Sequence, residues 1–163
     1  LGRPLAKWPQ DVLSDKQAQE AWRQFRCDNI TRLVREVHDE VRRVAPKCMI
    51  SAAVFNNYPA CRDSVGQDWK LWIEKGYLDF VCPMNYTASD AQFAALVKNQ
   101  LDLVQGRIPC YPGIGLLEGL GPVGAVRQIQ ITRQCRTGGF VLWSVYPQYM
   151  DIYPHLGKGI LAR

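Results

Sequence analysis

The stretch GYLDFVCPMNYT, residues 76–87, decides the fold of this chain. A glycine that ends a helical pattern leads into a mostly apolar run over residues 78–84, and polar side chains follow that run. A short apolar run of this kind suits a strand that is buried on both faces, as the strands of parallel sheets are. The stretch therefore predicts a buried strand with polar residues at its carboxyl end.

Similar runs alternate with helical patterns on both sides of this stretch. Three further apolar runs predict strands, over residues 48–55, 108–114 and 140–145. Apolar residues at helical spacing predict four helices, a long one over residues 15–44 and shorter ones around residues 69–73, 93–104 and 126–135. A serine followed three residues later by glutamine predicts a capping box before three of them, at Ser14 and Gln17, Ser64 and Gln67, and Ser89 and Gln92.

This alternation predicts an α/β fold in which parallel strands are joined by right-handed crossovers. Two architectures fit the pattern: an open doubly wound sheet, or part of a (βα)8 barrel. A complete barrel needs eight strands and about 250 residues, whereas this chain has 163 residues and four predicted strands. The pattern by itself leaves both architectures open. We expect residues 1–163 to form a single domain.

Composition narrows the range of partners. The net charge is +5, but many basic residues share the long predicted helix with acidic residues at i,i+4 spacing. Such pairs are typical of a solvated helix face, so we expect no nucleic-acid partner. The longest apolar run, residues 48–55, is too short to cross a bilayer, so we expect no membrane span. No signal peptide is visible, and the localisation stays open.

No cofactor and no metal site are expected. The six cysteines form no CxxC pair, and the two histidines are not at ligand spacing from any of them. Neither G-x-G-x-x-G nor G-x-x-x-x-G-K-[ST] occurs after a predicted strand, so a dinucleotide site and a phosphate-binding loop are unsupported.

Several segments of the chain resemble bacterial glycosyl-hydrolase-like family 10. The most specific is DSVGQDW at residues 63–69, continued by residues 76–87. The other matching segments are FRCDNITRLV at 25–34, SAAVF at 51–55 with NYP at 57–59, YPGIG at 111–115 and GFVL at 139–142. The resemblance covers about residues 22–146 and implies strands five to eight of a TIM barrel. It thus implies a partial (βα) barrel, a half TIM barrel with four parallel strands and flanking helices.

The resemblance also implies a function. Barrels of that family are thought to hydrolyse glycosidic bonds, and relatives act on cell-wall glycans, so the implied partner is a glycan. A half-barrel is either a fragment or a natural unit that closes by pairing with a second copy as a homodimer. We therefore expect a glycoside hydrolase-like domain that is incomplete as a catalyst by itself. The alternative is a non-catalytic carbohydrate-binding or assembly module built from the same strands.

Barrel enzymes place their sites at the carboxyl ends of the strands. Asn and Tyr or Trp suit sugars, because amides pair with hydroxyl groups and flat rings cover the apolar side of a pyranose. The predicted substrate-binding residues are Asn56, Asn57, Tyr58, Asn85, Tyr86, Trp143 and Tyr146.

Glycoside hydrolysis normally uses two carboxylates, about 5–5.5 Å apart for retention and about 6.5–9.5 Å apart for inversion. We predict Asp63, in the loop before a helix, and Glu118, in a glycine-rich loop, as the catalytic candidates. Asp68 is explained by its place in the first turn of a helix, where negative charge is stabilised. In the related family the position of Asn85 often holds an aspartate. An amide can orient a substrate but cannot act as a general acid or base, so this copy would be weakened or inactive.

Overall fold

A computed structural model describes residues 4, 6–116 and 119–161 of the chain. The chain divides into two compact units, which are described separately below. The helical unit comprises Leu1–Cys48 and Asn57–Tyr77, and the sheet unit comprises Met49–Asn56 and Leu78–Arg163. Among the described residues, no helix combines the length and the apolar character that a membrane span requires.

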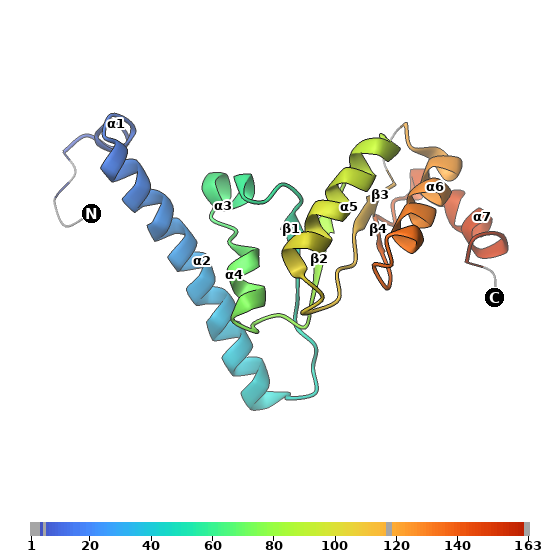
Figure 1. The fold of residues 1–163 in the computed structure, drawn as a ribbon, viewed down its shortest axis with the longest axis horizontal. Coiled ribbons are helices and arrows are strands. Elements are labelled where there is room, and N and C mark those ends of the chain that lie inside the picture. The colour runs from blue at the N-terminus through green and yellow to red at the C-terminus, as the bar shows by residue number, and fades with distance from the viewer. Residues whose placement is uncertain (1–3, 5, 117–118, 162–163) are drawn as a thin grey trace. The chain divides into compact units, whose positions relative to one another are not determined.

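The described residues of the helical unit form four helices, α1 (Gln10–Leu13), α2 (Lys16–Val44), α3 (Ala60–Val65) and α4 (Trp69–Glu74) (Figure 1). The long helix predicted over residues 15–44 is confirmed as α2, but the predicted cap at Ser14 is wrong. Asp15 is the N-cap, and its carboxylate accepts hydrogen bonds from the backbone N–H groups of Gln17 and Ala18 at 2.8 and 3.1 Å. Ser14 instead ends α1, which was not predicted, and its hydroxyl donates to the Gln10 carbonyl.

The second predicted cap, at Ser64, is also wrong. Ser64 lies inside α3, where its hydroxyl donates to the Ala60 carbonyl at 2.8 Å. Gly66 ends that helix in a left-handed conformation with φ +77°, and a Cβ there would lie 3.2 Å from the Arg26 carbonyl. The next helix, α4, starts after Asp68, whose carboxylate accepts a hydrogen bond from the Leu71 N–H. The glycine turn thus separates two short helices where one was expected.

The described residues of the sheet unit form four parallel strands in the order β1-β2-β3-β4. They are β1 (Ser51–Phe55), β2 (Phe80–Met84), β3 (Gly113–Gly115) and β4 (Val141–Trp143) (Figure 1). The predicted fold class, four parallel strands with flanking helices, is confirmed. Successive strands of an α/β barrel follow this sequential order, whereas a doubly wound sheet reverses its order at a switch point.

All four strands are shorter than predicted, and β3 differs most. We expected it over residues 108–114, but Cys110 makes only an isolated bridge to Val81 before the strand begins at Gly113. Pro109 and Pro112 explain the difference, because a proline has no N–H to donate to a ladder.

Helices α5 (Asp90–Val104), α6 (Gly121–Gln134) and α7 (Ile152–Lys158) complete the sheet unit, with a short 3-10 helix, η1, over Pro147–Tyr149. The third predicted cap is confirmed at Ser89, whose hydroxyl accepts a hydrogen bond from the Gln92 N–H at the start of α5. The reciprocal half of the capping box is not formed, because Gln92 Oε1 and the Ser89 N–H both bond to the Thr87 hydroxyl. One apolar core joins the three helices to β3 and the chain after it, through Phe93, Val97, Ile114, Leu116, Leu120, Ala125, Ile129, Ile152 and Leu156.

Side chains alternate between the two faces of the sheet. On the face packed against helices, Val54, Val81 and Ile114 are fully buried. On the other face, Phe55 is 46% exposed and Trp143 is 49% exposed. One face of the sheet therefore lies in the core, and the other retains accessible apolar and aromatic side chains.

Candidate functional site

The carboxyl ends of β1 and β2 are joined by a cluster of amide side chains. Asn85, the residue after β2, donates from Nδ2 to Oε1 of Gln100 at 2.9 Å, and Nε2 of Gln100 donates back to Oδ1 of Asn85 at 2.6 Å. Gln100 Nε2 also donates to the backbone carbonyl of Asn56 at 3.2 Å. Nδ2 of Asn56 in turn donates to the Met84 carbonyl at 2.9 Å. The cluster therefore links both strand ends to helix α5.

The backbone determines the orientation of these amides. A carbonyl can only accept, so the Gln100 atom that faces the Asn56 carbonyl must be the nitrogen. Oε1 of Gln100 then faces Asn85, which must present its own nitrogen there. Asn85 and Gln100 are both 0% exposed. Their hydrogen bonds satisfy one another inside the unit, so Asn85 orients the strand ends and presents no accessible side-chain surface.

An aromatic pair also lies at the carboxyl ends of the strands. The rings of Tyr86 and Trp143 are stacked, with centroids 6.1 Å apart and an interplanar angle of 16°. The glycines of β3 lie between β2, which ends two residues before Tyr86, and β4, which ends at Trp143. Gly115 is the register partner of Trp143, and a Cβ on Gly113 would lie 3.2 Å from Cε1 of Tyr86. Burial raises the pKa of the Tyr86 phenol.

The chain after β4 adds further groups to this edge. Tyr146 is largely accessible, and its ring meets that of Tyr149 edge to face at 6.5 Å. The peptide bond between Trp143 and Ser144 is cis. The Ser144 hydroxyl is buried and has no hydrogen-bond partner in the described part of the chain. Along the chain, a hydroxyl group without a partner and further aromatic rings therefore follow directly after Trp143.

Two of the predicted binding residues, Asn57 and Tyr58, belong to the helical unit. The Tyr58 hydroxyl donates to Oδ1 of Asp68 at 3.1 Å, and Nε of Arg62 donates to Oδ2 of the same carboxylate at 3.2 Å. Burial, followed by the neighbouring Asp68 charge, raises the pKa of Tyr58 to about 12. The Asn57 carbonyl accepts a hydrogen bond from the Cys61 N–H. Both residues therefore take part in the internal contacts of that unit.

The structure places the predicted catalytic residue Asp63 inside helix α3, not in a loop. Its carboxylate forms ion pairs with Arg62 at 3.1 Å and Arg23 at 3.2 Å. Glu118, the other predicted catalytic residue, lies outside the described residues. Asp90, near the carboxyl end of β2, pairs with Arg127 of α6. The described residues thus bring amides and aromatic rings together at the strand ends, whereas the carboxylates of Asp63 and Asp90 pair with arginines.

Metal-ligand chemistry has no support in the described ranges, which contain no group of three or more His, Cys, Asp or Glu side chains suited to a metal ion.

Two residues of this edge, Gln100 and Ser144, were not among the predicted binding residues. Gln100 occurs on the buried stripe of α5 that Phe93, Val97 and Val104 define. A polar residue on an apolar stripe is a signal that could have been read, because a buried amide needs partners. Ser144 had no such signal, since a serine beside a strand end is ordinary.

Comparison with known families gives one match. The model of the family Glycosyl hydrolase-like 10 matches residues 7–123 of the chain. No curated protein matches the chain.

Proposed function

The chain belongs to the glycosyl hydrolase-like 10 family, and we propose that its sheet unit holds a glycan at the carboxyl ends of its strands. The sugar would lie on the Tyr86–Trp143 pair, with Tyr146 beside it. We further propose that the chain is one part of a glycosidase barrel and is incomplete as a catalyst by itself.

The observation that carries this proposal is the aromatic pair. Two parallel rings at neighbouring positions on the strand edge, one of them half exposed, offer a flat apolar surface of the kind that covers a pyranose face. Gly113 of β3 favours this arrangement because it has no Cβ, and a Cβ there would lie only 3.2 Å from Cε1 of the Tyr86 ring.

The second candidate function is glycan binding without catalysis. The buried amide pair favours it, because Asn85 occupies a strand end where the related family often carries an acid. An amide neither gives nor takes a proton in general acid–base catalysis. Asp63 remains a candidate for the catalytic carboxylate. Its two ion pairs with arginines equally fit a purely structural role. Binding by the aromatic pair is common to both candidates.

Calorimetric titration with soluble oligosaccharides of cell-wall type tests the binding step. We expect Trp143→Ala to raise the Kd by at least about tenfold, because loss of a stacked ring removes roughly 1.4 kcal/mol or more of contact. Tyr86→Ala should act in the same direction. Trp8→Ala, which removes an accessible tryptophan of the helical unit, is the matched control and should leave the Kd unchanged. Equal affinity of wild type and Trp143→Ala would exclude the aromatic pair as the sugar site.

A reducing-sugar assay on the glycan that binds separates the two candidates. We expect no hydrolysis by the chain alone. Hydrolysis that Asp63→Asn abolishes, with binding retained, would favour a complete catalyst and contradict the proposal that the chain is incomplete.

A further inference from the structure

Tyr86, one of the two rings proposed to hold the sugar, lies beyond the paired part of its strand. The register between β2 and β3 ends at Met84 and its partner Gly113, two residues before Tyr86. Within the described part of the chain, Tyr86 neither donates nor accepts a hydrogen bond. The position of this ring therefore depends on the residues next to it in the chain and on the groups that it contacts.

Asn85 anchors the backbone directly before this ring. Its N–H donates to the Pro83 carbonyl at 3.0 Å, and its side-chain amide exchanges two hydrogen bonds with Gln100, of 2.9 and 2.6 Å. Because Asn85 is fully buried, a rotation of its side chain would leave polar groups unpaired inside the unit, which costs free energy. The amide pair thus keeps Asn85, and with it the start of Tyr86, in one orientation.

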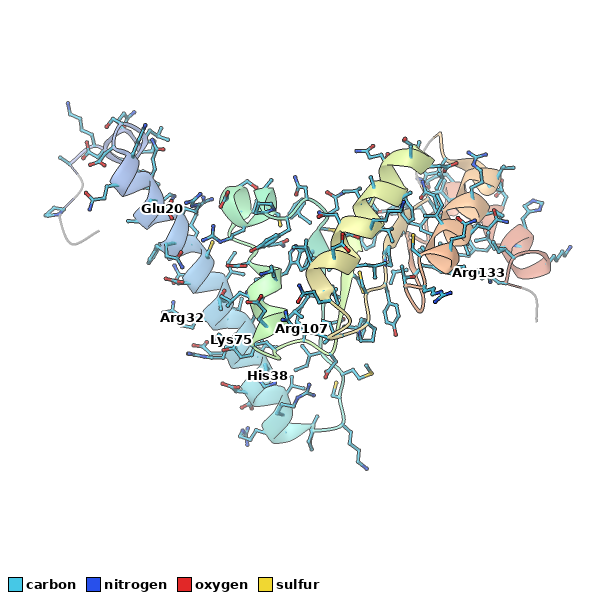
Figure 2. All side chains as sticks on the ribbon, viewed as in Figure 1. Glu20, Arg32, His38, Lys75, Arg107 and Arg133 are labelled. Atoms are coloured by element: carbon cyan, nitrogen blue, oxygen red, sulfur yellow. The ribbon has the colours of Figure 1, made fainter. Side chains whose placement is uncertain are left out.

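Gln100 is itself held in place by helix α5. The side chains of α5 radiate from the helix (Figure 2), and the buried stripe among them consists of Phe93, Val97, Gln100 and Val104. Both N–H groups of the Gln100 amide are used, one by Oδ1 of Asn85 and the other by the Asn56 carbonyl at 3.2 Å. Gln100 is fully buried and cannot touch a ligand. Any effect of this residue on binding must therefore pass through its neighbours.

The contacts of the Tyr86 ring make its orientation sensitive to this anchor. The ring lies close to the backbone of β3, since a Cβ on Gly113 would be 3.2 Å from its Cε1 atom. Its plane is within 16° of the Trp143 plane, with the centroids 6.1 Å apart. A sugar that lies across both rings needs this near-parallel arrangement. A rotation of the backbone at Asn85 would tilt Tyr86, because Tyr86 is the next residue.

We propose that Gln100 is a positioning residue of the glycan site. Its amide holds the Asn85 side chain, and Asn85 keeps the Tyr86 ring nearly parallel to that of Trp143. This inference rests on the proposed function, in which the aromatic pair binds the sugar. It adds a determinant of affinity that lies on a different element and makes no contact with the glycan.

A double-mutant cycle on the Kd for cell-wall oligosaccharides tests the proposal, by calorimetric titration at a temperature at which every variant is folded. Gln100→Met keeps the approximate shape of the side chain but cannot form its three hydrogen bonds. We expect it to raise the Kd by about three- to tenfold, and by no more than Tyr86→Ala does. In the Tyr86→Ala background the same change should leave the Kd unchanged, because the ring through which Gln100 acts is gone. A merely structural Gln100 would give the same increase in both backgrounds.

Val104→Ala is the matched control, because it removes apolar volume from the same buried stripe of α5 but touches none of the amides. It should lower the Tm and leave the Kd unchanged. If Gln100→Met does not fold, Gln100→Asn takes its place in the cycle with the same expectation, since its amide is shorter by one methylene group.

The outcomes separate this inference from the proposed function. No binding by the wild type, or an unchanged Kd in Tyr86→Ala, would overturn the proposed function and the positioning role with it. A raised Kd in Tyr86→Ala together with an unchanged Kd in the Gln100 variant would overturn the positioning role alone. Equal increases from the Gln100 change in both backgrounds would do the same.

Discussion

At the scale of single residues, the hydrogen-bonded amides of Asn85 and Gln100 restrict which residue types fit at position 85. Gln100 Oε1 can only accept, and its partner at position 85 must therefore donate. A neutral amide does so, whereas an ionised carboxylate would bring two acceptors together in a site without solvent. The pair thus explains why an amide fits at this strand end.

This reasoning predicts a pH-dependent defect in Asn85→Asp. Burial and the facing acceptor raise the pKa of the new carboxyl in the folded state. The variant should therefore lose stability as pH rises above the unfolded-state pKa of about 4, and at pH 7 it should be destabilised by roughly 1–3 kcal/mol or more. Urea unfolding between pH 4 and pH 8 measures this. Asn85→Ala also loses the hydrogen bonds but has no titrating group, and the excess pH dependence should be absent from it. Parallel pH profiles for the two variants would contradict the assigned orientation.

At the scale of elements, the amino terminus of α4 is a small network and not a simple cap. Asp68 accepts from the Leu71 N–H as N-cap, from the Tyr58 hydroxyl and from Arg62. One carboxylate therefore joins the start of α4 to residues at and before α3. This network explains why Asp68, and not the predicted Ser64, caps α4. An aspartate next to the helix can satisfy several hydrogen-bond donors at once.

Base titration of Tyr58→Phe tests this network. The pKa of Tyr58 is about 12 in the folded chain and about 10 when unfolded. A raised pKa means that its stabilising contribution is complete below pH 10 and is lost as pH rises towards 12. The variant should be less stable than wild type at pH 8 by about 1 kcal/mol, and this difference should shrink between pH 10 and pH 12. Urea unfolding across this range measures it, with Tyr77→Phe as the control. A difference that does not change with pH would contradict the contact between Tyr58 and Asp68.

At the scale of the whole molecule, the described strands leave one face of the sheet accessible and the outer edges of two strands without a paired strand. Within the described residues, β1 and β4 each pair with one neighbour, and one sheet face carries the accessible side chains of Phe55 and Trp143. Free edges and apolar faces favour pairing with another chain. We propose that a second copy pairs with these edges, which would complete eight strands.

Light scattering after size exclusion measures this association directly. We expect the wild-type chain to elute as a dimer, and Phe55→Lys to shift it towards the monomer because a charge would be buried in the interface. Val123→Lys, on helix α6 and 67% exposed, should leave the dimer intact. A wild-type monomer at micromolar concentration would exclude closure by a second copy.

Local patterns predicted a large part of the fold. The apolar runs predicted four strands, and helical spacing predicted α2, α5 and α6, because burial on one face imposes a period on the sequence. Prediction failed where neighbouring signals competed, as at Ser14 beside Asp15 and at Ser64 before Gly66. It also failed at the strand ends, since prolines before Gly113 shortened β3.

By itself, the sequence determined the α/β class, the parallel strands, the Ser89 cap and the strand ends at which Asn85, Tyr86 and Trp143 lie. Tertiary structure alone decided which of these side chains meet. The amide pair of Asn85 and Gln100 and the stacking of Tyr86 on Trp143 both join different elements. Periodicity reports which face of an element is buried, but contacts between elements depend on how their faces pack, and no local pattern contains that information.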